Sequence, residues 1–283
     1  MWPLKIPLLE PARTYLACVG KSKDTKRREL LVGANTTVRK AGRALRRAAA
    51  DGTLHNLDGN DFTVEGISTS DFVDWVYENG MQTVAGKRIR DALMAAPVDE
   101  RCPLCRVGTV RQLDHVVPKS VFPALCVDPL NLVPACERCN LIKGDSMPQS
   151  AAETLLHPYL DRISHTRWLH ARTVATPVGV RLEFFVAAPD SWDPTLISRV
   201  TRHFKLLDLG TRYAQHANRT ITDVNQMVTR LRASGDATVV RSYLRGEAES
   251  RFAADANSIE GVTYVTLSAD DRYCHGPSGA PTT

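Results

Sequence analysis

The stretch from Cys102 to Asp145 decides the fold at the centre of the chain, and it runs CPLCRVGTVRQLDHVVPKSVFPALCVDPLNLVPACERCNLIKGD. Two Cys-x-x-Cys pairs lie within it, Cys102 with Cys105 and Cys136 with Cys139, and 30 residues separate the pairs. Each pair can place two thiolates on one ion from a tight turn, and two pairs complete the four-sulfur site typical of structural zinc. The sequence therefore predicts one structural zinc ion per chain.

The alternative for these cysteines is a redox Cys-x-x-Cys, but that motif needs a thioredoxin-like βαβ context, which the sequence lacks. A disulfide framework is also disfavoured, because the chain has seven cysteines, an odd number. Since four sulfur ligands leave zinc no open position, we expect the ion to hold the module together and not to catalyse. We expect Cys18, Cys126 and Cys274 to be free thiols.

The segment between the two cysteine pairs contains the residues suited to catalysis. His115 can deprotonate water, because imidazole titrates near neutral pH. Asp114 and Asn140 offer hard oxygen donors, which Mg²⁺ or Mn²⁺ prefers when it also binds a phosphate. Asp114 and His115 are neighbours, so a regular strand would point them to opposite faces, and the backbone must bend for both to reach one phosphate.

This order of residues resembles the HNH, or ββα-metal, endonuclease family, and the resemblance covers Cys102 to Asp145. It rests on the two cysteine knuckles, the Asp-His pair, a following Asn and the final Asn-x-x-Lys, all in register. The resemblance implies a β-hairpin that presents Asp114 and His115, and a short helix, beginning near Glu137, that carries Asn140. It further implies that His115 activates water, that Asp114 and Asn140 hold a catalytic Mg²⁺ or Mn²⁺, and that Asn131 orients His115.

The chain departs from the family at one position, because Asn140 stands where many members have a histidine ligand. Lys143, one helical turn after Asn140, and Lys119 are candidates for contact with phosphate groups. DNA is the substrate that the resemblance implies. An RNA-targeting or modification-dependent nuclease and a non-catalytic zinc module that binds nucleic acid or protein remain alternatives. A catalytic site would depend on Mg²⁺ or Mn²⁺, whereas a zinc-held binding module would be indifferent to added Mg²⁺.

Charge divides the N-terminal region into two opposed blocks. Residues 1–50 carry 12 Lys and Arg against 3 Asp and Glu, whereas residues 51–100 carry 3 against 10. The basic block can contact phosphates, or it can be a solvated helix face docked on the acidic block, and both interpretations stay open. If the acidic block covers the basic block or the active site, deleting residues 1–97 should raise cleavage of generic DNA.

The predicted fold class is α+β, with a central ββα-metal module and mainly helical flanks. We expect three regions: a helical N-terminal region (1–97), the nuclease module (98–150) and a mostly helical C-terminal region (151–283). The predicted helices cover residues 24–50, with a break near Gly33 or Gly42, a run that starts at an N-cap on Ser70, and residues 84–96, 194–207, 212–233 and 238–254. Strands are predicted over 180–187 and 262–267, and the tail 277–283 is expected to be disordered.

The layout of the whole chain is similar to that of HNH proteins of prokaryotic anti-phage systems of the Septu kind. This similarity implies an ATPase partner or a homo-oligomer. The chain has 283 residues, 43% hydrophobic and 24% charged, and lacks an apolar run of the ~20 residues that a membrane span requires. The start is a poor secretory signal, so we expect a cytoplasmic protein without membrane partners.

The motif His157-Pro158-Tyr159 follows the module, and proteins of the HNH family with a similar layout often have a comparable motif. The sequence assigns it no catalytic role. We expect Tyr159 to pack against the hairpin.

Overall fold

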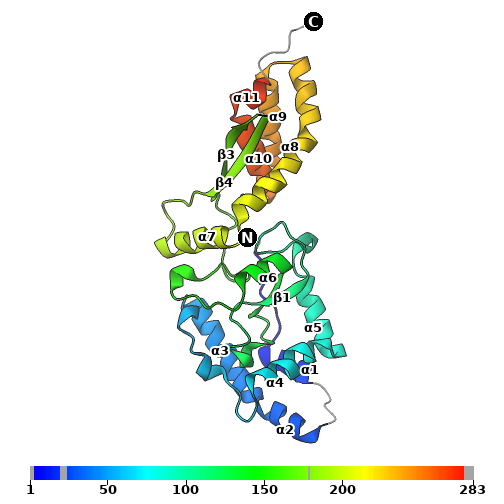
Figure 1. Cartoon of the computed structure of the whole chain (residues 1–283), viewed down its shortest axis with the longest axis vertical. Coiled ribbons are helices and arrows are strands. Elements are labelled where there is room, and N and C mark those ends of the chain that lie inside the picture. Colours follow the sequence, from blue (N-terminus) through cyan, green and yellow to red (C-terminus); the bar gives the residue numbers. More distant parts are fainter. Residues whose placement is uncertain (1–2, 20–23, 178, 277–283) are drawn as a thin grey trace. The chain divides into compact units, whose positions relative to one another are not determined.

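The computed structural model describes residues 3–19, 24–177 and 179–276, and it divides into two compact units, Met1–Asp161 and Arg162–Thr283. In the described residues, two small antiparallel sheets of two strands each accompany many helices, so the fold mixes α and β structure (Figure 1). The first unit contains both the predicted N-terminal helical region and the predicted nuclease module.

The elements of the first unit are α1 (Pro11–Val19), α2 (Thr25–Gly33), α3 (Asn35–Ala50), α4 (Thr69–Val73), α5 (Val84–Met94), β1 (Gln112–His115), β2 (Leu132–Ala135) and α6 (Glu137–Lys143). Short helical turns join them at η1 (Leu54–Asn56), η2 (Gly59–Phe62), η3 (Asp74–Glu78), η4 (Gly80–Gln82), η5 (Val98–Glu100), η6 (Pro123–Leu125) and η7 (Ala151–Glu153).

The second unit contains β3 (Leu169–Thr176), β4 (Gly179–Val186), α7 (Pro194–Leu206), α8 (Leu209–Ser234), α9 (Ala237–Ala254), α10 (Ile259–Ser268) and α11 (Asp271–His275).

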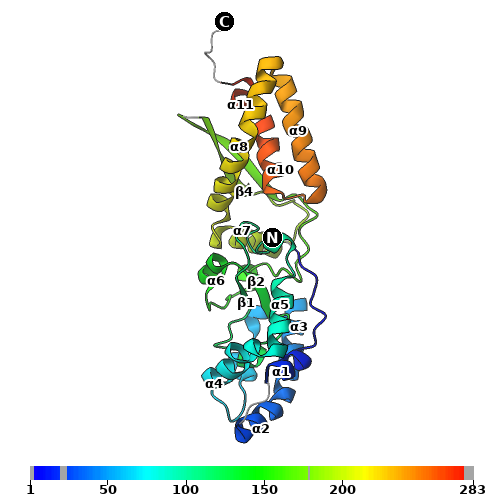
Figure 2. The same cartoon turned by 90° about the vertical axis from the view of Figure 1, so that its right-hand side faces the viewer.

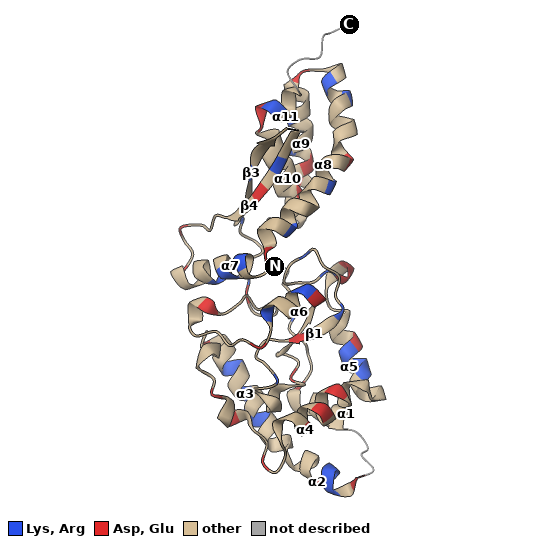
Figure 3. Ribbon diagram, in the orientation of Figure 1, with Lys and Arg blue, Asp and Glu red and all other residues tan. Residues whose placement is uncertain are grey.

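The basic N-terminal segment forms two helices, α2 and α3, and α3 is amphipathic, as predicted. On α3 the apolar positions recur at three- and four-residue steps and are buried. Basic positions lie between them along the helix (Figure 3), and all of these are exposed except Arg46, which is half-buried. The break between α2 and α3 lies at Gly33, and α3 continues through Gly42. Gly42 is required for another reason: a Cβ there would lie 2.7 Å from Oδ2 of Asp128.

The acidic segment forms α4 and then a π-helical turn, η3. The predicted N-cap at Ser70 is wrong by two residues, because the extended backbone of Ser68 lets its Oγ accept the N–H of Asp71 at 3.1 Å. In η3 the N–H of Asn79 donates to the carbonyl of Asp74, five residues earlier, at 2.9 Å. The next helix, α5, begins after an N-cap on Thr83 and ends at Met94, close to its predicted limits.

The hairpin of β1 and β2 joins the N-terminal helices through its long connection, residues 116–131. Within the hairpin, Gln112 pairs with Ala135 and His115 pairs with Leu132. Phe122, in the connection, packs edge-on against Phe62 with ring centroids 5.1 Å apart. Asp128, also in the connection, is 1% exposed and forms an ion pair with Arg46 of α3 at 3.0 Å. The helices and the hairpin therefore share one hydrophobic core.

The second unit packs a helical layer against the β3–β4 ribbon. Both views show α8, α9 and α10 side by side (Figures 1 and 2), and α8 and α10 contact the ribbon. The strand predicted over 180–187 is confirmed as β4, and its partner β3 was not predicted. The three helices predicted between 194 and 254 are confirmed as α7, α8 and α9.

The predicted strand over 262–267 is wrong, because these residues lie in α10. Their β-branched and aromatic side chains favour a strand locally. Ser258 nevertheless caps a helix by accepting the N–H of Gly261 at 3.1 Å, and α10 is buried against α8, α9 and β3. Tertiary packing thus overrides the local propensity. The tail 277–283 lies outside the described residues.

Within the described residues, no helix has the length and apolar character that crossing a bilayer requires.

Candidate functional site

The four predicted zinc ligands come together between the start of the hairpin and α6. Cys102 and Cys105 lie on a turn closed by a hydrogen bond from the N–H of Cys102 to the carbonyl of Gly108, at 2.8 Å. Cys136 is the N-cap residue of α6, and Cys139 lies in the first turn of that helix. The four Sγ atoms all lie within 4.8 Å of one another.

The cysteine cluster fits a zinc ion in both geometry and chemistry. A tetrahedral site with Zn–S bonds of about 2.3 Å places its sulfur atoms about 3.8 Å apart. The Sγ atoms of Cys105 and Cys136 are separated by 3.8 Å, and all four cysteines are buried. The predicted cluster of four cysteines is therefore confirmed as a group able to hold zinc.

His115 ends β1, and a backbone carbonyl fixes its imidazole. Nε2 of His115 lies 2.9 Å from the carbonyl oxygen of Cys126. Since a carbonyl only accepts hydrogen bonds, Nε2 must carry the proton, and Nδ1 is left as the proton acceptor. The residue is 8% exposed, and burial lowers the pKa of His115 to about 3. The imidazole is thus neutral at physiological pH.

Asp114 and Lys143 form a nearly buried ion pair beside this histidine. Nζ of Lys143 lies 3.2 Å from Oδ1 of Asp114 and also donates to the carbonyl oxygen of His115. The Lys143 side chain is 11% exposed and that of Asp114 is 6% exposed. Burial raises the pKa of Asp114 to about 6, although the Lys143 ammonium acts to lower it. The carboxylate therefore favours a nearby positive charge.

Asn131 is fully buried, and its side chain holds the hairpin connection closed. Its Oδ1 accepts the N–H of Val117 at 2.8 Å, and its Nδ2 donates to the carbonyls of Val117 and Leu125 at 3.1 Å each. Leu125 precedes Cys126, whose carbonyl accepts the hydrogen bond from Nε2 of His115. Asn131 therefore holds the Leu125 carbonyl, and the adjacent Cys126 carbonyl holds the imidazole. The Asn131 amide bonds only to backbone groups of the connection in these contacts.

Asn140 lies on α6, directly after Cys139 and one turn before Lys143. The residue is partly exposed. Its backbone belongs to the helix, and its side-chain amide hydrogen-bonds none of the residues that the structure describes. The amide oxygen is therefore available to a ligand.

Lys119, the other predicted phosphate contact, is paired with the acidic N-terminal segment. Its Nζ lies 2.5 Å from Oε1 of Glu78 and 4.4 Å from the ring centroid of Tyr77. The Tyr77 ring packs edge-on against the imidazole of His115, with centroids 4.6 Å apart and planes at 66°. One short segment, η3, therefore supplies contacts to both His115 and Lys119.

Tyr77, Glu78 and the carbonyl of Cys126 were not predicted from the sequence. Nothing in the local pattern marks them, because the first two belong to an expected helix and the third acts through its backbone. Only the tertiary fold brings residues 77 and 78 to the end of β1.

The motif His157-Pro158-Tyr159 packs against the hairpin, as expected. The hydroxyl of Tyr159 donates to the carbonyl of Leu132 in β2 at 3.0 Å, and Nε2 of His157 lies 3.2 Å from the carbonyl of Leu130. The motif therefore supports the strand that pairs with β1.

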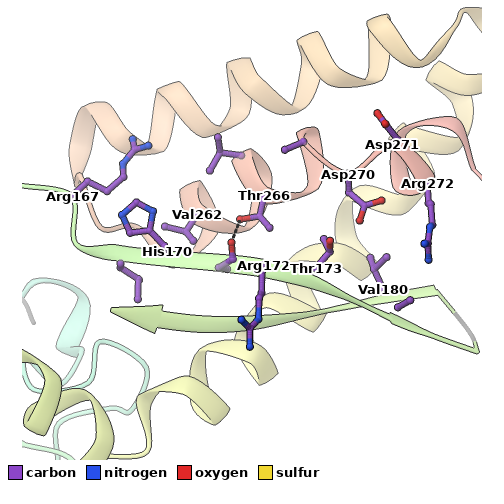
Figure 4. Close-up of a pocket in the computed structure, with 15 residues that line it drawn as sticks. Arg167, His170, Arg172, Thr173, Val180, Val262, Thr266, Asp270, Asp271 and Arg272 are labelled. Atoms are coloured by element: carbon purple, nitrogen blue, oxygen red, sulfur yellow. Dashed lines mark hydrogen bonds between the residues drawn. The ribbon is translucent and has the colours of Figure 1, made fainter. Parts of the chain in front are cut away.

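A cavity of about 740 Å³ lies in the second unit, between β3 and α10 (Figure 4). Arg167 and His170 line one end of it, and Val180 and Arg272 lie toward the other end. It includes none of the predicted site residues, all of which belong to the first unit. This cavity and the predicted site residues therefore belong to different units of the described chain.

Comparison with known proteins gives two matches and no family. The chain is 28% identical to Protein ea31 of Escherichia phage lambda over 249 residues, which are 81% of this chain and 82% of that protein. It is 34% identical to Septu protein PtuB of Bacillus thuringiensis over 64 residues, 23% of this chain and 24% of that protein. No family model and no solved structure matches the chain. The similarity to the Septu protein is therefore weak and partial.

Proposed function

We propose that this chain is a metal-dependent endonuclease of the HNH kind that hydrolyses phosphodiester bonds of DNA. One observation carries the proposal: His115 is held as a neutral imidazole with Nδ1 free to accept a proton, and the preceding residue of β1, Asp114, has a buried carboxylate. The order β1, β2 and α6, with two cysteine pairs at its ends, supports it.

In this proposal His115 is the general base. Nδ1 takes a proton from water as the water oxygen attacks phosphorus, the bond from phosphorus to the 3′ oxygen breaks, and the leaving oxygen takes a proton from solvent water. The products carry 5′-phosphate and 3′-hydroxyl ends. Asp114 and Asn140 would hold a Mg²⁺ or Mn²⁺ ion, which when bound stabilises negative charge on the phosphoryl and leaving oxygens.

The donor set around Asp114 fits such an ion. Burial of the carboxylate raises the pKa of Asp114, and the positive charge of Lys143 lowers it. A bound cation would lower the pKa in the same way as Lys143. Asn140 adds an amide oxygen that makes no hydrogen bond within the described chain. Oxygen donors of these two types match the preference of Mg²⁺ and Mn²⁺.

An anti-phage role is part of the proposal, and the partial similarity to a Septu protein supports it. An ATPase partner or a second copy of the chain would then supply the trigger. One site of this kind cuts one strand, so a duplex break needs two protomers or two successive nicks.

The test uses supercoiled plasmid, Mg²⁺ or Mn²⁺, and the full chain with its zinc content measured by mass spectrometry. The wild type should nick the plasmid, and His115→Ala should not, although it retains zinc. His275→Ala, which removes an exposed histidine in the second unit, is the matched control and should nick like the wild type. EDTA should stop nicking, and added Mg²⁺ should restore it.

Equal inertness of the wild type and His115→Ala toward DNA would contradict the proposal for DNA. Cleavage of RNA or of modified DNA by the same proteins would then favour the alternative nucleases. Binding of nucleic acid without cleavage, and without an effect of Mg²⁺, would favour the non-catalytic zinc module.

A further inference from the structure

We infer that Tyr77 is a positioning residue for His115: its ring locks the imidazole in the orientation that keeps Nδ1 free. The inference rests on the proposed function for its catalytic meaning, because it assigns a role to a residue that acts through the base. The contact itself can be tested without any nuclease activity.

The imidazole of His115 is held from two sides. Nε2 hydrogen-bonds the Cys126 carbonyl at 2.9 Å, and the Tyr77 ring packs edge-on with its centroid 4.6 Å from the imidazole centroid. A hydrogen bond to one nitrogen restrains only one edge of the ring. A half turn about the Cβ–Cγ bond would exchange Nδ1 with Cδ2 and would break the hydrogen bond of Nε2, so that bond opposes the rotation, and the neighbouring Tyr77 ring adds a steric barrier to its path.

Tyr77 is itself fixed by contacts to the strand that carries His115. Its hydroxyl donates to the carbonyl of Leu113 in β1 at 3.3 Å. The ammonium group of Lys119 lies 4.4 Å from the Tyr77 ring centroid, a distance typical of a cation–π contact, and is held there by Glu78. The tyrosine therefore moves with β1 and not independently of it.

The π-helical turn η3 explains how Tyr77 reaches the hairpin. A turn with a hydrogen bond across five residues rotates the following side chains relative to a regular α-helix, and such turns are frequent at functional sites. Here Val76 is fully buried in the first unit, while the next residue, Tyr77, is turned toward His115. A strictly α-helical continuation of α4 would direct the side chain of residue 77 elsewhere.

The experiment compares Tyr77→Leu and Tyr77→Phe with the wild type, all loaded with zinc. Long-range ¹H–¹⁵N spectra of histidine-labelled protein report which nitrogen of His115 carries the proton. The wild type and Tyr77→Phe, which keeps the ring, should show the single Nε2–H form. Tyr77→Leu should show a mixture of forms and a nicking kcat reduced about tenfold or more with KM unchanged, because a misplaced base loses reactive geometry.

Tyr243→Leu, at a partly buried tyrosine of α9, is the matched control and should leave both measurements unchanged. A folded, zinc-loaded Tyr77→Leu protein with the wild-type His115 spectrum would overturn the inference. If the wild type does not nick DNA, the proposed function fails, and the spectra still decide whether Tyr77 positions the imidazole.

Discussion

Asp114 keeps its charge inside the protein because Lys143 lies next to it. Removal of one partner of a buried ion pair leaves the other charge uncompensated, at a cost of about 3–5 kcal/mol. A divalent cation bound to Asp114 would compensate the carboxylate charge, as the Lys143 ammonium does. The pair therefore provides a way to detect cation binding at Asp114 without measuring cleavage.

Lys143→Met should lower the melting temperature in metal-free buffer, and added Mg²⁺ should then raise it by more than in the wild type. Thermal denaturation with and without Mg²⁺ measures both effects. Lys119→Met is the matched control, because its ion pair is exposed and is expected to contribute less than about 1 kcal/mol. An equal response of Lys143→Met and the wild type to Mg²⁺ would argue against Asp114 as a cation ligand.

The gathering of the four cysteines was predictable from the sequence and is confirmed. Asp114, His115 and Lys143 were also predicted, and Lys143 contacts both of the others, while their catalytic roles stay predictions. Residue type and spacing are enough to predict such groups, because the chemistry requires particular side chains. Residue type and spacing cannot predict the role of the Cys126 carbonyl, since every residue has a carbonyl and only the fold determines which one contacts His115.

Helix α3 crosses the hairpin connection so closely that only glycine fits at position 42. A methyl group there would lie 2.7 Å from the buried Asp128 carboxylate and 3.1 Å from Pro11, whereas a methyl group at Gly33 would meet nothing within 4 Å. Gly42→Ala should therefore destabilise the protein by about 1–3 kcal/mol, the range for overpacked cores. Gly33→Ala should be neutral or stabilising by up to about 1 kcal/mol.

Urea denaturation of the two glycine variants measures these differences. Equal stability of Gly42→Ala and Gly33→Ala would mean that α3 does not lie against the Asp128 loop as described.

The π-helical turn η3 places an acidic side chain where a phosphate group is expected to bind. Since the Glu78 carboxylate is paired with Lys119, it must be displaced before Lys119 can contact DNA. Glu78→Gln should increase the affinity for a short DNA duplex by about threefold or more at low salt, and the gain should shrink as salt is added. Fluorescence anisotropy titrations at several salt concentrations measure it.

Glu65→Gln is the control for this effect, because it removes the same charge from an exposed position in the same acidic segment. If both variants bind DNA alike, net charge and not the Lys119 contact accounts for the change. These point variants replace the deletion of residues 1–97 as a test of masking. That deletion would also remove Arg46, Phe62 and Tyr77, which pack against the hairpin or its connection.

Elements with strong periodicity were predictable, and those set by tertiary contacts were not. The long helices α3, α7, α8 and α9 each show one apolar face, which marks them in the sequence. By contrast, α10 has a β-prone sequence that becomes helical because it is buried against α8, α9 and β3. The π turn at residues 74–78 has no sequence signature, since its extra residue per turn is selected by the packing around it.

The molecule consists of two compact units, and only the first contains the cysteine cluster. Structural zinc couples ion binding to folding, so loss of the ion should affect the first unit alone. We expect a strong zinc chelator to speed amide exchange in β1 and β2 by more than about tenfold while leaving α9 and α10 protected. Hydrogen exchange with mass spectrometry resolves these segments in one experiment.

Unchanged exchange in β1 and β2 after verified zinc removal would show that the hairpin folds without the ion. Faster exchange in α9 and α10 as well would show that the two units unfold together. The predicted division into 1–97, 98–150 and 151–283 stays a prediction, because a sequence shows where composition changes but not which segments share a core.

The ion pair between half-buried Arg46 and buried Asp128 has a consequence for protein engineering. A nuclease cassette cut out at residues 98–150 and fused to another carrier would take Asp128 along and leave its counter-ion behind. The transplanted segment would then contain a buried carboxylate without its counter-ion. A portable version must either carry α3 with it or replace Asp128 by a neutral residue that still accepts the N–H of Leu130.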